Sequence, residues 1–257
     1  MAWLDLSAVG MRYGDGPDAV VALDAISLAI EEHEFVTIVG PSGCGKSTLL
    51  YLVGGFLQAS AGQIRLGGRP ITGPGRDRGI VFQRYSLFPW RTVRGNIAYG
   101  LEEQGLPRRE RDRIVRDHVR LVHLEGFEDR YPRELSGGMQ QRVALAQTLA
   151  CNPEILLMDE PFGALDAQTR RILQAEVRRI WHRDRKTVLF VTHDVEEAVA
   201  LGTRIVVMSA RPGRIKSVID RGFDVAEGDQ FEANPAFIQM KLDIWRSVKE
   251  EVEAARA

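Results

Sequence analysis

The sequence is poor in cysteine, in long apolar runs and in net charge, and each shortage excludes a class of protein. Its two cysteines, Cys44 and Cys151, have no metal-ligand spacing, so we expect free thiols in a reducing compartment. No run approaches the roughly 18 apolar residues of a membrane span, and the first residues lack the pattern of a signal peptide. The formal net charge of −1 argues against nucleic acid as a partner.

The composition is typical of a protein that folds around a core. The chain has 257 residues, of which 44% are hydrophobic and 27% charged. This length suffices for one large domain or two small ones. We therefore expect a globular protein with a substantial apolar interior.

The segment from Gly40 to Thr48 carries the strongest local pattern. It follows the apolar run 35–39 and precedes a second apolar stretch, which predicts a strand, a glycine-rich loop and a helix. Such a loop turns its backbone N–H groups toward a phosphate at the positive helix N-terminus. We expect Lys46 to reach the β- and γ-phosphates and Ser47 to offer its hydroxyl to Mg²⁺. The loop comprises Gly40, Pro41, Ser42, Gly43, Cys44, Gly45, Lys46, Ser47 and Thr48.

Short alternating runs surround this loop and predict strands. Residues 3–13 and 20–30 alternate between apolar and polar side chains on either side of a turn at 14–18. Tyr13 ends the first run, where its ring could stack on a nucleotide base or simply cover a half-buried strand face. Further strands are expected at 62–66 and 79–82, the latter followed by Gln83.

From Thr92 to about Cys151 the apolar spacing becomes helical, which predicts a helical subdomain. The arginines between 108 and 120 alternate with acidic residues, so we expect a solvated helix face and no nucleic-acid patch. Ser136 is a good N-cap for the helix that follows Gly137 and Gly138. The open N–H groups there fit either a second anion site or a simple capped helix start.

The segment 154–160 contains a continuous apolar run of strand length that ends on two carboxylates, Asp159 and Glu160. A strand that is apolar on both faces belongs in a mostly parallel sheet, and ligands bind at the carboxyl end of such strands. We expect Asp159 to hold Mg²⁺ directly or through water, and Glu160 to polarise an attacking water. The alternative is that both carboxylates cap the next turn.

A further strand is expected at 186–191, with His193 just beyond its carboxyl end. A lone histidine is usually structural, but this one could touch a γ-phosphate at the same sheet edge. The other histidines lack this context and are interpreted as surface or packing residues. They are His33, His118, His123 and His182.

The order of these motifs resembles that of the nucleotide-binding subunit of ABC transporters, over roughly residues 3–220. The resemblance rests on Tyr13, the loop at 40–48, Gln83, the segment 135–139, the strand 155–160, the segment 163–166 and His193. It implies an α/β fold: a RecA-like P-loop ATPase core with an antiparallel β edge subdomain and an inserted α-helical subdomain at about 89–151. A C-terminal amphipathic helical tail, 221–257, would follow an ABC domain over 1–220.

The resemblance also implies roles for individual residues, with ATP and Mg²⁺ as cofactors. Tyr13 would stack on adenine, and Gln83 would sense Mg²⁺ and the membrane partner. Asp166 would help to organise a dimer interface, and His193 would contact the γ-phosphate. The implied catalytic residues are Lys46, Gln83, Glu160 and His193, and the implied metal ligands are Ser47, Gln83 and Asp159. Ser136, Gly137 and Gly138 would contact ATP bound to the opposite subunit.

By the same resemblance the chain would form a homodimer around ATP, bind integral membrane permease subunits and serve a solute-binding protein indirectly. It would sit peripherally at the cytoplasmic face of the inner membrane. The segment 87–96, with its Pro-Trp pair, resembles importers of nitrate, sulfonates or taurine. The alternatives are an exporter or lipid-moving ATPase and a soluble ABC ATPase of DNA repair or translation. An ATPase of DNA repair would need a coiled-coil insertion and one of translation a tandem domain, and we expect neither in this sequence.

Two further parts of the sequence each have two possible roles. Trp90 could anchor a short helix of the membrane subunit, with the segment 84–90 around it, or could belong to the core of the helical subdomain. The tail carries apolar residues at helical spacing from about Pro235 to Ala255. That helix could dock on its own domain or serve an interface or regulatory role.

Overall fold

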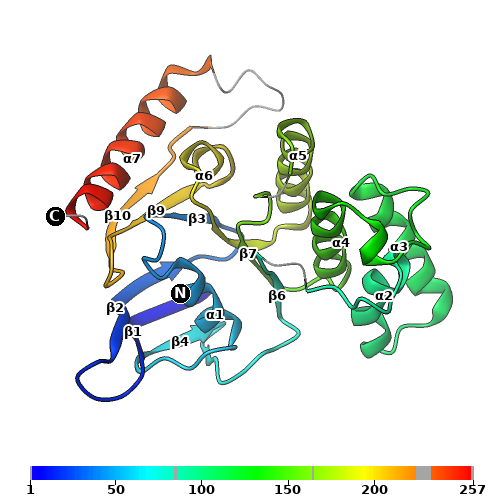
Figure 1. Ribbon diagram of the computed structural model, residues 1–257, viewed down its shortest axis with the longest axis horizontal. Helices are drawn as coiled ribbons and strands as arrows, with labels where there is room; N and C mark the ends of the chain where they lie inside the picture. The colour runs from blue at the N-terminus through cyan, green and yellow to red at the C-terminus, as the bar shows by residue number, and fades with distance from the viewer. Residues whose placement is uncertain (1, 84–85, 164, 224–232, 256–257) are drawn as a thin grey trace. The chain divides into compact units, whose positions relative to one another are not determined.

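The computed structural model describes residues 2–83, 86–163, 165–223 and 233–255 (Figure 1). The chain divides into two compact units, one of Met1–Gly75 with Trp181–Ala257 and one of Arg76–Ile180. None of the helices in the described ranges combines the length and the apolar character that a membrane span needs. The expected division into a domain over 1–220 and a tail over 221–257 stays a prediction.

An antiparallel sheet forms one half of the first unit. Its strands follow the order β2-β1-β4-β5. They are β1 (Leu4–Tyr13), β2 (Val20–Ile30), β4 (Ala61–Leu66) and β5 (Arg69–Pro70). Leu4 pairs with Ile30 and Leu6 with Leu28, so the buried members of the alternating runs share one face. The strands predicted at 3–13, 20–30 and 62–66 are confirmed, as is the antiparallel edge subdomain.

A second set of strands in this unit follows the order β10-β9-β3-β8. The strands are β3 (Phe35–Val39), β8 (Thr187–Val191), β9 (Arg204–Met208) and β10 (Ile215–Asp220). β3 pairs in parallel with both β8 and β9, and β3 and β8 are buried along their whole length. Continuous apolar strands are expected in a sheet covered on both faces. The chain leaves the three parallel strands at the same edge, at residues 40, 192 and 209.

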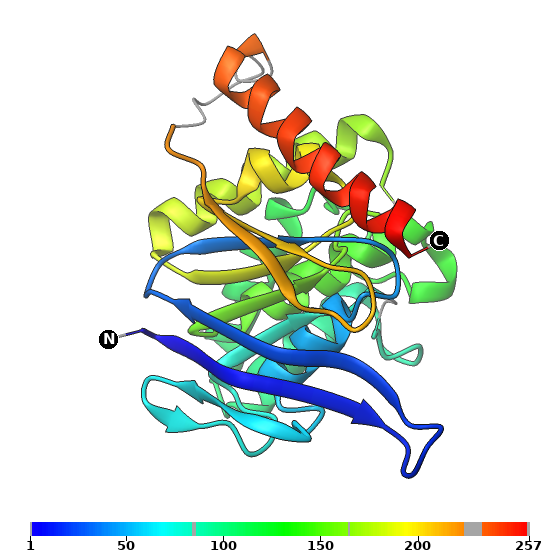
Figure 2. The same cartoon turned by 90° about the vertical axis from the view of Figure 1, so that its left-hand side faces the viewer.

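Three helices complete the first unit: α1 (Lys46–Gly54), α6 (Val195–Leu201) and α7 (Pro235–Ala254). α7, red in Figures 1 and 2, lies alongside α6. Its Phe237 and Ile244 are fully buried in a cluster with Val39 and Val207, the residues near the ends of β3 and β9. The docking of the tail helix on its own unit is therefore confirmed, while Trp245 on its outer side remains 53% exposed.

The second unit combines a parallel strand pair with helices. β6 (Arg78–Val81) pairs with β7 (Ile155–Asp159). The helices are α2 (Val93–Glu103), α3 (Arg108–Leu121), the 3-10 turn η1 (Pro132–Glu134), α4 (Gly137–Ala150) and α5 (Ala167–Asp184), whose last residues belong to the first unit. α2, α3 and α4 pack on one another, which confirms the helical character predicted from Thr92 to Cys151. α3 buries Val115 and Val119, and most of its arginines lie outside, as expected.

The buried face of α7 provides a stability test. Phe237→Ala should lower the free energy of unfolding by about 3–5 kcal/mol, because it leaves a cavity in a closed cluster. The matched control is Trp245→Ala on the same helix, which should change it by about 0.5 kcal/mol or less. Urea denaturation followed by circular dichroism measures both. Equal effects of the two substitutions would contradict the docking of α7 by its Phe237 face.

Candidate active site

The phosphate-loop segment has the predicted strand, loop and helix form. β3 ends at Val39, and α1 begins at Lys46. Gly45 has a φ of 99°, and a Cβ on it would lie 2.6 Å from Cδ2 of Leu23 and 3.0 Å from the carbonyl oxygen of Ala22. Only glycine combines this conformation with such close packing. The loop is thereby pressed against β2, with its N–H groups at the start of α1.

Lys46 places its charge at the centre of this loop. Its Nζ donates to the carbonyl oxygens of Gly40 at 2.8 Å and Pro41 at 3.0 Å, and the residue is only 6% exposed. A buried ammonium group surrounded by a loop of backbone dipoles is a strong point charge for an anion. Burial raises the pKa of the neighbouring Cys44 thiol, although Lys46 opposes the shift. Cys44 is therefore a neutral packing residue of the loop.

Tyr13 and His193 lie at two other places in the same unit. The hydroxyl of Tyr13 is 3.3 Å from Oγ1 of Thr48, so the tyrosine lies over the first turn of α1 and remains exposed. His193 is exposed just beyond β8. The structure thus brings Tyr13 to the phosphate loop. Its stacking on adenine stays a prediction, as does the γ-phosphate contact of His193.

A buried network fixes the backbone on both sides of His193. Thr192 donates its hydroxyl proton to Oε2 of Glu197 at 2.5 Å and accepts a hydrogen bond from the Asp194 N–H at 3.0 Å. Asp194 in turn caps α6 by accepting from the N–H groups of Glu196 and Glu197. Both Thr192 and Glu197 are buried. This network was not predicted from the sequence, because Thr192, Asp194 and Glu197 form no distinctive motif.

In the second unit the two carboxylates occupy the end of β7. Asp159 is 1% exposed, and Glu160 follows with a φ of 47°. The Glu160 carboxylate accepts a hydrogen bond from Nε2 of Gln83 at 3.1 Å, and its carbonyl accepts from Nε2 of Gln141 at 3.3 Å and from the Gly163 N–H at 3.2 Å. A left-handed backbone held by several hydrogen bonds is typical of functional sites. The structure thus brings together Gln83 and Glu160.

The predicted metal ligands suit Mg²⁺ by their chemistry. Mg²⁺ binds hard oxygen ligands and usually keeps several waters. Asp159 provides a carboxylate, Ser47 a hydroxyl, and Gln83 an amide oxygen, since its Nε2 is bonded to Glu160. Each of these oxygen donors is of the kind that Mg²⁺ binds, and the metal site itself stays a prediction.

Ser136 caps α4 as predicted and stands exposed at its start. Its hydroxyl oxygen accepts from the Met139 N–H at 3.3 Å, and α4 begins at Gly137. Gln140 donates to the carbonyl oxygens of Pro132 and Leu135, which fixes the preceding turn. The start of α4 is thus capped by Ser136 and still exposed at Ser136 and Gly137. Its role as an anion site stays a prediction.

Asp166 lies directly before α5, two residues after Ala164, which falls outside the described residues. Its Oδ1 accepts from the Thr169 N–H at 2.9 Å, and this backbone hydrogen bond lowers the pKa of Asp166. The carboxylate also interacts electrostatically with Arg142. Burial lowers the pKa of Arg142, and the charge of Asp166 opposes this shift. Asp166 is therefore a fixed anion at neutral pH, and its predicted role at a dimer interface is untested.

A cavity and an aromatic cluster lie near each other in the second unit. The cavity has a volume of about 340 Å³, and β6, α2 and α4 supply most of its lining, including Ile80, Tyr99 and Thr148. The rings of Phe88 and Tyr99 are 4.5 Å apart between centroids, and those of Phe88 and Trp90 are 5.6 Å apart. Trp90 is 71% exposed, so its interpretation as subdomain core is wrong. Arg84 and Tyr85 of the proposed segment lie outside the described residues.

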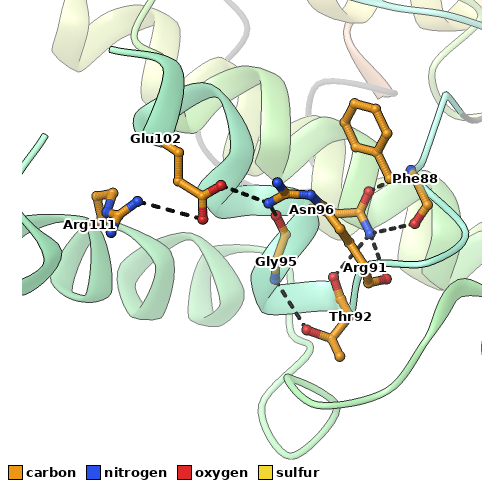
Figure 3. Close-up of polar contacts among 7 residues, drawn as sticks. All are labelled: Phe88, Arg91, Thr92, Gly95, Asn96, Glu102 and Arg111. Atoms are coloured by element: carbon orange, nitrogen blue, oxygen red, sulfur yellow. Dashed lines mark hydrogen bonds and ion pairs between the residues drawn. The ribbon is translucent and has the colours of Figure 1, made fainter. Parts of the chain in front are cut away.

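Asn96 fixes the backbone of the turn from Phe88 to Thr92 (Figure 3). It is fully buried, accepts from the Phe88 N–H at 2.8 Å and donates to the carbonyl oxygens of Phe88, Arg91 and Thr92. Glu102 accepts from Arg91 at 2.8 Å, and Arg91 lies over the ring of Tyr99. The backbone that carries Phe88 is thus held by several hydrogen bonds, which were not predicted from the sequence.

The chain is similar in sequence to known proteins. The sequence model of a family described as ABC transporter matches residues 23–163. The taurine import ATP-binding protein of Rhizobium johnstonii is 47% identical over 251 residues, 96% of this chain and 94% of that protein. The nitrate import ATP-binding protein of Synechocystis is 53% identical over 198 residues, 77% of this chain and 74% of that protein.

A solved structure agrees with these relatives. It is a dimeric, post-hydrolysis state of an ATP-binding cassette bound to ADP and Pi. It is 34% identical, has a TM-score of 0.79 and covers 86% of this chain and 100% of its own. The resemblance stated from the motifs and the predicted fold class are confirmed.

Proposed function

The chain belongs to the ABC transporter family and is an ATPase of transport, and we propose that it energises the import of a small polar solute. The proposed solute class is that of nitrate, sulfonates or taurine, and the names of two relatives, a taurine and a nitrate import protein, support it. The observation that carries the proposal is the phosphate loop, in which the buried ammonium group of Lys46 lies among the loop carbonyls and Gly45 permits the tight turn.

The phosphate loop and the predicted metal ligands would together hold ATP and Mg²⁺. The N–H groups of residues 40–48 and the charge of Lys46 bind the ATP phosphates. Ser47, Gln83 and Asp159 would hold Mg²⁺, whose positive charge would offset the charge of the phosphate oxygens.

Glu160 polarises the attacking water, and the hydrogen bond from Gln83 orients its carboxylate. His193 contacts the γ-phosphate from the end of β8, and Tyr13 stacks on the adenine. The fixed backbone around His193 supports this task, because the flanking hydrogen bonds limit where the imidazole can go.

We propose further that two copies form a dimer around ATP. The open start of α4 at Ser136, Gly137 and Gly138 offers N–H groups to the nucleotide of the second copy. Asp166 contributes a fixed anion at that interface. The dimeric cassette of the solved relative supports this arrangement.

A permease in the membrane is the second partner. The cavity beside β6 and the exposed ring of Trp90 offer an apolar recess with an aromatic anchor, which suits a short helix of that permease. The chain then works peripherally at the cytoplasmic face of the inner membrane, and a solute-binding protein delivers the solute on the other side.

The chemistry is tested by Glu160→Gln. The substitution keeps the size of the side chain but removes the carboxylate, so ATP turnover should fall by about 10²–10⁴-fold while ATP binding persists. Lys46→Ala should weaken binding as well, since it removes the charge at the loop centre. Steady-state phosphate release and equilibrium binding measure the two effects. Turnover of Glu160→Gln within threefold of the parent protein contradicts the assignment.

The docking surface is tested by Trp90→Ala. Because the ring is exposed, the isolated chain should keep its melting temperature and its own ATPase activity. In the complex reconstituted with its permease, solute-stimulated ATPase and uptake should drop, since interface tryptophans often contribute about 2 kcal/mol or more. Trp245→Ala, which removes another exposed tryptophan, is the matched control. Normal transport by the Trp90 variant argues against docking at this ring.

A further inference from the structure

The loop 209–214 joins β9 to β10 and packs directly on the phosphate loop. Val207 of β9 is the parallel partner of Val39 in β3, so both strands deliver their loops to the same edge. A Cβ on Gly40 would lie 3.0 Å from the Met208 carbonyl oxygen, and one on Gly213 would collide with the carbonyl oxygen of Cys44. The two loops therefore touch at both ends, with glycine at each contact.

Hydrogen bonds fix the loop 209–214 from the β2 side. The Gly213 N–H donates to Ala22 and its carbonyl accepts from Asp24, both at 3.0 Å. Nε of Arg214 donates to the Asp24 carboxylate at 2.9 Å. The loop is thus anchored on the strand that also supports Gly45.

The helix α7 fixes the loop from the other side. Oε2 of Glu251 accepts from the Ala210 N–H at 3.0 Å, and Lys216 forms an ion pair with Glu251 at 2.9 Å. The pKa of Glu251 is lowered mainly by the backbone hydrogen bond from Ala210 and next by the hydrogen bond from Lys216. Glu251 is therefore ionised at neutral pH and holds the backbone next to Arg211.

Arg211 differs from the other arginines of this region. Arg204 and Arg214 form ion pairs with Glu34 and Asp24. Within the described part of the chain, Arg211 forms neither a hydrogen bond nor an ion pair, and it is exposed. Its Nη2 lies 3.8 Å from the position that a Cβ on Gly43 would take. An unpaired guanidinium group thus stands beside the exposed Gly43 of the phosphate loop.

We infer that Arg211 is a second cationic residue for the polyphosphate of the bound nucleotide, in addition to Lys46. The inference rests on the proposed assignment of the phosphate loop. A guanidinium group donates two parallel hydrogen bonds to phosphate oxygens, which a lysine ammonium group cannot do. The anchored backbone of the loop places this group beside Gly43 before the nucleotide arrives, so less ordering is needed on binding.

The test compares Arg211→Ala and Arg211→Lys with the parent chain and with Arg69→Ala, an exposed arginine on β5 in the other sheet of the same unit. Calorimetric titration with ADP and with ATP, each with Mg²⁺, gives Kd, and steady-state kinetics give KM and kcat. Arg211→Ala should raise Kd for both nucleotides about tenfold, or about 1.4 kcal/mol. KM should rise by a similar factor, with a much smaller change in kcat, and Arg211→Lys should recover only part of the loss.

Several results would overturn the inference. It fails if Arg211→Ala binds ADP and ATP as the parent and Arg69→Ala chains do. It also fails if nucleotide affinity is kept but ATP-driven association weakens, because Arg211 then faces the second copy. Lys46→Ala is measured alongside. Normal nucleotide binding by Lys46→Ala refutes the phosphate-loop assignment itself. Weak binding by Lys46→Ala together with normal binding by Arg211→Ala refutes only the role of Arg211. Equal melting temperatures of the Arg211 variants and the parent chain exclude misfolding as the cause.

Discussion

The rest of the structure depends on a close approach of backbones around the phosphate loop that only glycine permits. Gly45 lets the loop press against Leu23 of β2, and Gly213 lets the loop after β9 reach Cys44. Side chains at either position would push these segments apart. The N–H groups at the start of α1 and the charge of Lys46 could then no longer converge on one anion.

Two buried charges lie where the parallel strands end. Lys46 is buried among the carbonyl oxygens of its own loop, while Asp159 closes a buried strand. Burying a charge is costly, and buried charges at the carboxyl ends of strands are typical of functional sites. The left-handed backbone of Glu160 belongs with these features, since three hydrogen bonds in its own unit maintain a conformation that otherwise costs about 1–3 kcal/mol.

Much of the fold and the central motifs could be predicted from the sequence because they are local. The phosphate loop, the strand ending at Asp159 and the cap at Ser136 each lie within a few consecutive residues. Arg211 and Asn96 could not be found this way, because their roles arise from contacts with segments distant in sequence or with several carbonyls of a folded turn. The helix α6 was not assigned, since its seven residues are too few for a clear helical period. The strands β9 and β10 were not assigned either.

We propose that ATP bound at the phosphate loop of one copy recruits the open start of α4 in a second copy. Sedimentation velocity of Glu160→Gln with ATP and Mg²⁺ tests it most directly, because slow turnover preserves the bound nucleotide. The account predicts a dimer that forms only with ATP and returns to monomer when Ser136→Arg is added. A persistent monomer at high concentration, or a dimer indifferent to ATP, would contradict the account.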